Sequence, residues 1–258
     1  MTGTLVVAIG GGTHTGRVRA ANQDSWFVAD RVHVVADGMG GHAAGEVASA
    51  IAVARLAELA DRSPLRPDDV RAAIAEADAA ITATAAEHPD KAGMGTTVTG
   101  LCQVQVAGSA HWLVFNVGDS RLYRFADGAL TQLTEDHSHV AELVAAGEIT
   151  AEEAREHPLG NIVTRSLGSP VAAEPDLRVF PPVPGERFLI CSDGLTGEIT
   201  DDLIAQVLAE ESEPQAAVDR LIALALAAGG RDNVTVVVVD HLAVRGEPAG
   251  TTAPRGGR

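Results

Sequence analysis

Four aspartates occupy similar places in the sequence: each stands at an end of a short apolar segment, with glycine or asparagine as a neighbour. They are Asp37, Asp119, Asp193 and Asp232. A carboxylate at a strand end, beside a residue that frees the backbone, can project into a cleft at the rim of a sheet. One such aspartate is more often a turn former, but four close together would repel one another unless a cation neutralised them. The pattern therefore predicts a cation site.

Oxygen ligands without histidine or cysteine favour hard cations such as Mg²⁺, Mn²⁺ or Ca²⁺. A zinc site would need nitrogen or sulfur ligands. The nearest candidates, His137 and His139, have no evident third ligand, and we interpret them as loop or structural residues. Two divalent ions about 3.5–4 Å apart activate water for attack on phosphorus. The aspartates therefore favour phosphoryl hydrolysis.

A phosphate must also be held, and Arg19 is the candidate for this role. It precedes Asp24 and the expected strand 25–29. The planar guanidinium of arginine can bind two phosphate oxygens at once. Taken alone, an arginine at this position would be interpreted as an ordinary surface residue.

A different class of enzyme is suggested by the segment from Gly38 to Ala43, which matches G-x-G-x-x-A and is followed by Glu58. That spacing is typical of a dinucleotide-binding turn. Asp37 opposes this interpretation, because its charge would repel a pyrophosphate, and the later strands form hairpins rather than parallel units. A second glycine-rich segment, Gly10–Gly12, lacks the lysine of a phosphate-binding loop and is interpreted as a turn.

The elements that would position these residues are mainly short strands. We expect strands at 4–9, 25–29, 32–36, 96–106, 111–117, 121–125, 129–133, 177–180, 186–191 and 234–240. Short connections at Asp30-Arg31 and Asp127-Gly128 predict hairpins. Helices are expected at 46–60, 68–85, 140–146, 151–156, after a cap at Thr200, and at 214–228. Helices clustered between hairpins predict stacked antiparallel sheets covered by helices.

Composition narrows the class of protein. The 258 residues include 19 basic and 35 acidic side chains, a formal charge of −16, and no basic run, which argues against a nucleic-acid partner. No segment is long and apolar enough to predict a membrane span, and the N-terminus does not resemble a signal peptide.

Cys102 and Cys191 lie in apolar runs and are expected to be reduced thiols, which indicates a cytoplasmic protein. Residues 1–243 are expected to form one domain, and 244–258 a disordered tail.

The motifs together resemble, in order, those of the metal-dependent type 2C serine/threonine protein phosphatases, in particular the bacterial single-domain branch. The resemblance extends from about Thr13 to Asp240. The matching segments are 19–25, 35–42 with 45–46, 95–97, 117–121, 133–138, 164–168, 192–195 and 232–235.

The resemblance implies a fold and a ligand set. The fold would be α+β, a four-layer α-β-β-α sandwich of two antiparallel sheets flanked by helix pairs. Two Mn²⁺ or Mg²⁺ ions would be bound, with a third in bacterial members. Asp37 would bridge the first two, the Gly38 carbonyl would bind the first, and Asp193 and Asp232 the second. Asp119 would hold the third ion together with Asp193.

The resemblance also implies that Arg19 binds the substrate phosphate and that residues 137–167 form a mobile flap. Gln23 and Asp24 would lie around the metal ligands, although many members have glutamate in place of Gln23. Eukaryotic members have a histidine, thought to act as proton donor, where this chain has Met39. His42 is the nearest titratable candidate for that role; the alternative is a structural histidine, with water as the donor.

The partners implied by resemblance are phosphorylated proteins, including serine/threonine kinases and their substrates. Two alternatives stay open at this point. One is a non-catalytic scaffold of the same fold that binds phosphoproteins, which the complete aspartate set disfavours. The other is the dinucleotide-binding enzyme suggested by the Gly38–Ala43 segment.

Overall fold

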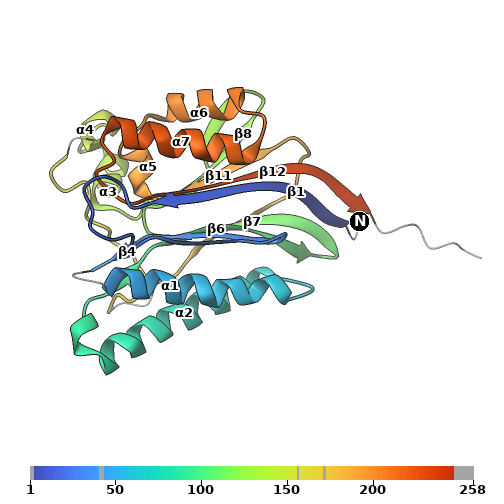
Figure 1. Cartoon of the computed structure of the whole chain (residues 1–258). Helices are drawn as coiled ribbons and strands as arrows, with labels where there is room; N and C mark the ends of the chain where they lie inside the picture. The colour runs from blue at the N-terminus through green and yellow to red at the C-terminus, as the bar shows by residue number, and fades with distance from the viewer. Residues whose placement is uncertain (1–2, 41–43, 156, 171–172, 247–258) are drawn as a thin grey trace, which may run out of the picture.

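Two five-stranded sheets stacked face to face form the centre of the molecule. The computed structural model describes residues 3–40, 44–155, 157–170 and 173–246. Helices α6 (Asp201–Glu210) and α7 (Pro214–Ala228) cover one sheet, and α1 (Ala44–Ala57) and α2 (Pro67–Glu87) cover the other (Figure 1). The predicted four-layer α-β-β-α sandwich is confirmed.

The strands of both sheets pair in an antiparallel manner. The first sheet has the order β1-β12-β11-β8-β9, and the second β10-β7-β6-β3-β2. Every strand pair among the described residues is antiparallel, so the parallel unit required by the dinucleotide-binding hypothesis is not found there. The first sheet comprises β1 (Gly3–His14), β12 (Val234–Gly246), β11 (Arg187–Cys191), β8 (Arg121–Ala126) and β9 (Ala129–Gln132); the second comprises β10 (Asp176–Phe180), β7 (Ser109–Val117), β6 (Val98–Val106), β3 (Val32–Ala36) and β2 (Ser25–Val28).

The short elements lie close to the candidate site. Strands β4 (Gly38–Met39) and β5 (Gly95–Thr96) form a separate two-stranded ladder, and α5 (Asp193–Thr196) directly follows β11. Neither β4 nor α5 was predicted, because such short elements have no periodicity to detect. The remaining short helices are η1 (Glu58–Asp61), η2 (Pro89–Lys91), α3 (His139–Ala145) and α4 (Ala151–Arg155). The predicted cap is confirmed: the Thr200 hydroxyl accepts a hydrogen bond from the Leu203 amide at the start of α6.

Three apolar clusters hold the layers together, and aliphatic side chains dominate them, as the low aromatic content requires. One lies between the sheets and includes Trp112 and Phe188, whose rings meet edge to face at 5.4 Å. The others join each sheet to its helix pair. Removal of this apolar surface from water is the main stabilising contribution to such a sandwich.

The Gly10–Gly12 segment is part of β1 and not the turn that we expected. Added at Gly10, a Cβ atom would lie 2.5 Å from the Gln215 backbone nitrogen; at Gly11, it would lie 2.4 Å from the Trp26 ring. These glycines therefore allow α7 and Trp26 to pack directly against β1. The sequence alone did not reveal this requirement, because close approach depends on residues distant in the chain.

Several general expectations can be compared with the structure. No helix in the described ranges is long and apolar enough to cross a membrane. Cys102 and Cys191 are free and buried. Strand β12 continues to Gly246, and residues 247–258 lie outside the described residues. The domain limits at 243 and 244 stay a prediction.

Candidate active site

The topology brings the four predicted aspartates to one edge of the sandwich. Asp37 follows β3 and Asp119 follows β7; both strands pair antiparallel with β6 and therefore run in the same direction. Asp193 follows β11, and Asp232 precedes β12, the antiparallel neighbour of β11. Residues far apart in sequence thus meet where the two sheets end.

Asp37 is at the centre of the group. Burial raises the pKa of Asp37 well above its usual range, and the charges of Asp24, Asp193 and Asp119 raise it further. The carboxyl groups of Asp37 and Asp193 also share a hydrogen bond. Two carboxyl groups so close together hold a proton or require a cation, because two bare charges would repel each other strongly.

The backbone at Asp37 is held by threonine side chains. The Asp37 amide donates to Thr97 Oγ1, and the Asp37 carbonyl accepts from Thr96 Oγ1, both at 2.9 Å. The Thr97 hydroxyl also shares a 2.8 Å hydrogen bond with Ser120 beside Asp119. This buried network fixes the ends of β3 and β7 relative to each other.

Asp119 and Asp193 form the side of the group nearest β8. Burial raises the pKa of Asp119 to about 7, with a further contribution from the charge of Asp193. The pKa of Asp193 is also raised, first by burial and then by the charge of Asp232. Asp119 is positioned by Gly118, whose φ of +112° and close contact with Thr97 suit glycine.

Asp24 lies behind these residues and is buried. Its Oδ2 accepts hydrogen bonds from Thr235 Oγ1 at 2.6 Å and Ser192 Oγ at 2.8 Å. Its Oδ1 has no hydrogen-bond partner among the described residues. Burial raises the pKa of Asp24 to about 7. A buried carboxylate oxygen with unused acceptor capacity is suited to water around a cation.

Arg19 reaches the group from the solvent side. Its Nη2 donates a 2.6 Å hydrogen bond to Asp232 Oδ2, and its side chain is 54% exposed. The charges of Asp193 and Asp37 also act on the guanidinium. The predicted phosphate-binding residue therefore lies beside the predicted metal ligands and remains accessible.

Asn233 was not predicted, yet it anchors the loop that carries Arg19. Its Nδ2 donates to the carbonyls of Thr15 and Ala21 at 2.8 and 3.0 Å, and its Oδ1 accepts from the Gln23 amide at 2.8 Å. The side chain is buried, so these bonds are shielded from water. The only sequence signal was its position directly after Asp232.

Gly38 is packed against the start of α1. A Cβ atom at Gly38 would lie 2.2 Å from the Gly45 carbonyl oxygen and 2.5 Å from the Gln23 carbonyl oxygen. A Cβ atom at Gly45 would similarly lie 2.7 Å from the Gly38 carbonyl. Both positions require glycine, which explains their place in the sequence motif.

The remaining predicted residues separate into two cases. His137 is structural: its Nδ1 accepts from the Gly118 amide, and its Nε2 lies 3.0 Å from Asp176 Oδ2. This agrees with our interpretation of His137 as a structural residue. His42 lies outside the described residues, so its role as proton donor stays a prediction.

The chemistry of the group fits Mg²⁺ or Mn²⁺. Its ionisable donors are carboxylates, which these cations prefer, and burial is the largest cause that raises the pKa of Asp24, Asp37, Asp119 and Asp193. Within the described ranges, no three His, Cys, Asp or Glu side chains are already closed around a single metal position. Carboxylates that repel one another are expected to close only around a cation.

The chain is similar to known proteins along most of its length. Residues 11–229 match the family model described as protein phosphatase 2C. The chain is 45% identical over 242 residues to the serine/threonine protein phosphatase PstP of Mycobacterium tuberculosis, covering 92% of this chain but only 45% of that protein. It is 37% identical over 240 residues to the serine/threonine phosphatase stp of Listeria monocytogenes, covering 89% and 94% of the two chains.

Solved structures agree with the sequence matches. A crystal structure of the Mycobacterium tuberculosis serine/threonine phosphatase PstP/Ppp has a TM-score of 0.86 at 42% identity, covering 93% of this chain and 100% of that one. The catalytic domain of PstP in complex with 2 manganese ions has a TM-score of 0.85 at 40% identity, with the same coverage. The motifs, the antiparallel sandwich and these matches agree: the chain belongs to the protein phosphatase 2C family.

Proposed function

We propose that the chain is a metal-dependent serine/threonine protein phosphatase. The observation that carries this proposal is the group of buried carboxyl groups around Asp37, which lies beneath an accessible arginine. The family membership and the manganese complex of the PstP catalytic domain support it. Substrates would be phosphoserine and phosphothreonine in proteins.

Metal binding is assigned to the predicted residues. Asp37 would contact two Mn²⁺ or Mg²⁺ ions, the Gly38 carbonyl would bind the first, and Asp193 and Asp232 the second. Asp119 and Asp193 would bind a third ion. When bound, such ions neutralise phosphate charge and lower the pKa of water so that it can attack phosphorus.

The protein side chains have separate tasks in this proposal. Arg19 would hold two phosphate oxygens through its guanidinium and orient the phosphorus towards the carboxylate group. Asp24, with its Oδ1 unpartnered among the described residues, and Gln23 would position water around the ions. His42 is the candidate donor of a proton to the departing serine or threonine oxygen.

The wider biological role is also a proposal. Phosphorylated proteins, including serine/threonine kinases and their substrates, are the expected partners. The free, buried Cys102 and Cys191 are consistent with a reducing compartment, and we place the chain in the cytoplasm. A non-catalytic scaffold is disfavoured because all four predicted ligands and Arg19 are retained together.

The test is hydrolysis of p-nitrophenyl phosphate and a phosphothreonine peptide with Mn²⁺, with Mg²⁺ or with chelator. Activity should require metal and fall more than about 100-fold in Asp37→Ala, Asp193→Ala or Asp232→Ala. Loss of a residue that only hydrogen-bonds to a metal ligand typically reduces activity by about 10- to 100-fold, and loss of the ligand itself should cost more. Asp127→Asn, in an exposed turn, is the matched control. Full activity in chelator, or in Asp37→Ala, would contradict the proposal.

A further inference from the structure

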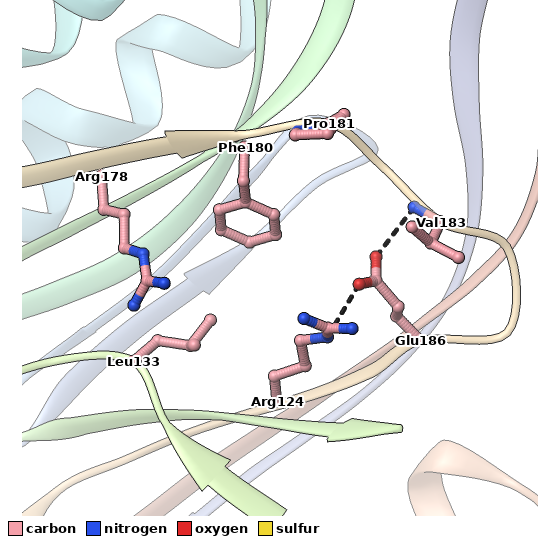
Figure 2. Close-up of a pocket in the computed structure, with 7 residues that line it drawn as sticks. All are labelled: Arg124, Leu133, Arg178, Phe180, Pro181, Val183 and Glu186. Atoms are coloured by element: carbon pink, nitrogen blue, oxygen red, sulfur yellow. Dashed lines mark hydrogen bonds and ion pairs between the residues drawn. The ribbon is translucent and has the colours of Figure 1, made fainter. Parts of the chain in front are cut away.

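A cavity lies between β8 of the first sheet and the edge strand β10 of the second, away from the carboxylate group. Its volume is about 180 Å³, and its lining includes Arg124 on β8 and Arg178 and Phe180 on β10 (Figure 2). In the β10–β7 register, Phe180 lies opposite Trp112, towards the end of β7 far from Asp119. The cavity is therefore separate from the catalytic edge.

The two arginines give this cavity a positive charge in a chain whose formal charge is −16. Arg124 Nε forms a 2.8 Å ion pair with Glu186 Oε1, and the Glu186 side chain is only 2% exposed. One arginine is thus balanced by one carboxylate. Arg178 is exposed, and its side chain has no hydrogen bond or ion pair within the part of the chain that the structure describes. The guanidinium of Arg178 is therefore a positive charge at the cavity that no carboxylate among the described residues neutralises.

The wall opposite Arg178 is fixed before any ligand binds. Glu186 Oε2 accepts a 2.9 Å hydrogen bond from the Val183 amide, and the Val183 carbonyl lies 2.8 Å from His241 Nδ1. The Gly185 amide also donates to the His241 carbonyl. A wall tied in this way loses little conformational freedom on binding.

The remaining surface of the cavity is apolar. The Phe180 ring projects between Arg178 and Glu186, and Leu133 lies beside the Arg178 guanidinium (Figure 2). A flat ring can pack against an aromatic side chain and an arginine plane. A cavity of about 150 Å³ is large enough for benzene, so this one has room for a single ring with a small acidic group.

From this geometry we infer that the Arg124–Arg178 cavity binds a small organic acid with one flat ring, its carboxylate held by Arg178 and its ring placed against Phe180. Arg178 supplies the charged, bidentate contact. Phe180 and Leu133 discriminate against inorganic anions, which have no apolar part. No catalytic residue takes part.

The inference can be tested by titrating the Mg²⁺-loaded protein with sodium benzoate and following residue-specific chemical shifts by NMR. Saturable shifts are expected at Arg178 and Phe180. Sodium acetate and sodium sulfate should bind at least about tenfold more weakly, because they lack the ring. Equal binding of acetate or sulfate would overturn the assignment to a ring acid.

Variants separate this cavity from other anion sites. Arg178→Gln should weaken benzoate binding about tenfold or more, whereas Arg178→Lys should keep part of the affinity. Arg71→Gln removes an exposed arginine of α2 and should leave binding unchanged. Arg19→Ala should also leave it unchanged, since Arg19 belongs to the catalytic edge.

Folding of Arg178→Gln is checked by thermal melting, and basal phosphatase activity should be unaffected because Arg178 is outside the catalytic group. Absence of saturable shifts at Arg178 in the wild type, or shifts that persist in folded Arg178→Gln, would overturn the inference. Loss of the shifts in Arg19→Ala would also overturn it, by showing that benzoate binds at the active site.

Discussion

Arg19 Nη2 donates a 2.6 Å hydrogen bond to Asp232 Oδ2, joining the predicted phosphate-binding residue to a predicted metal ligand. The two side chains are 54% and 35% exposed, and exposed pairs of this kind contribute only about 0–1 kcal/mol to stability. The contact can therefore hold Arg19 over the site and still release it. A phosphate would replace Asp232 as its partner at little energetic cost.

Arg19→Ala should raise KM about tenfold or more with a smaller effect on kcat, because ground-state binding of phosphate is lost. Arg19→Lys should recover only part of the loss, since lysine lacks the planar fork. Steady-state kinetics on a phosphothreonine peptide measure both constants, and Arg31→Ala, in a surface hairpin, is the matched control. Unchanged KM and kcat in Arg19→Ala would show that Arg19 is a bystander.

Asn233→Ala should loosen the Arg19 loop, since one side chain makes three hydrogen bonds to its backbone. Loss of these buried bonds should reduce the free energy of unfolding by about 1–3 kcal/mol and raise KM. If Asn233 acts through Arg19, the double variant with Arg19→Ala should have no higher KM than Arg19→Ala alone. Additive increases in KM would instead indicate independent roles.

Asp119→Ala should reduce turnover while two metal ions stay bound, if Asp119 serves only the third ion. Burial is the largest cause of the raised pKa of Asp119, and the charge of Asp193 is the second. Asp119 therefore lies close to Asp193, with which it would share the third ion. Isothermal titration calorimetry with Mn²⁺ counts the ions. Loss of all bound metal in this variant would make Asp119 a ligand of the first two ions.

His42→Ala tests the proton donor. A serine or threonine oxygen needs a proton as it leaves, whereas nitrophenolate hardly does. If His42 is the donor, the variant should hydrolyse the phosphothreonine peptide far more slowly, with a much smaller loss on p-nitrophenyl phosphate. Equal losses on both substrates would make His42 a structural residue.

His33 should make stability depend on pH. It is fully buried between the sheets, and both ring nitrogens lack partners among the described residues. Burial lowers the pKa of His33 to about 3. The unfolded chain binds a proton at His33 near pH 6.5, and the folded chain binds it only near pH 3. Stability is therefore lost as the pH is lowered from about 6.5 to about 3, by up to about 1.4 kcal/mol per pH unit.

Two variants isolate the effect of His33. His33→Gln and His33→Leu should both lose this part of the pH dependence, measured as the difference from wild type in urea unfolding. Only His33→Leu should also gain stability at neutral pH, because it removes buried polar atoms without partners. A wild-type slope retained in both variants would show that His33 does not titrate as described.

Local patterns in the sequence predicted most of the elements. Strand β3 and helix α7 begin and end where expected, and the Asp30-Arg31 hairpin joins β2 to β3 as expected. These features depend on apolar periodicity, caps and short turns, which involve neighbouring residues only. The four aspartates could be singled out for the same reason, because each is marked by its own strand end.

Tertiary structure decided how those residues interact. The place of Gly10–Gly12 within β1 depends on contact with α7 and Trp26, and the role of Asn233 depends on backbone groups of a loop at the other end of the chain. The Arg124–Arg178 cavity exists only because β8 of one sheet and the edge strand β10 of the other lie near each other. Contacts between distant segments leave no periodic signal in a single sequence, because packing and burial, not local propensity, select them.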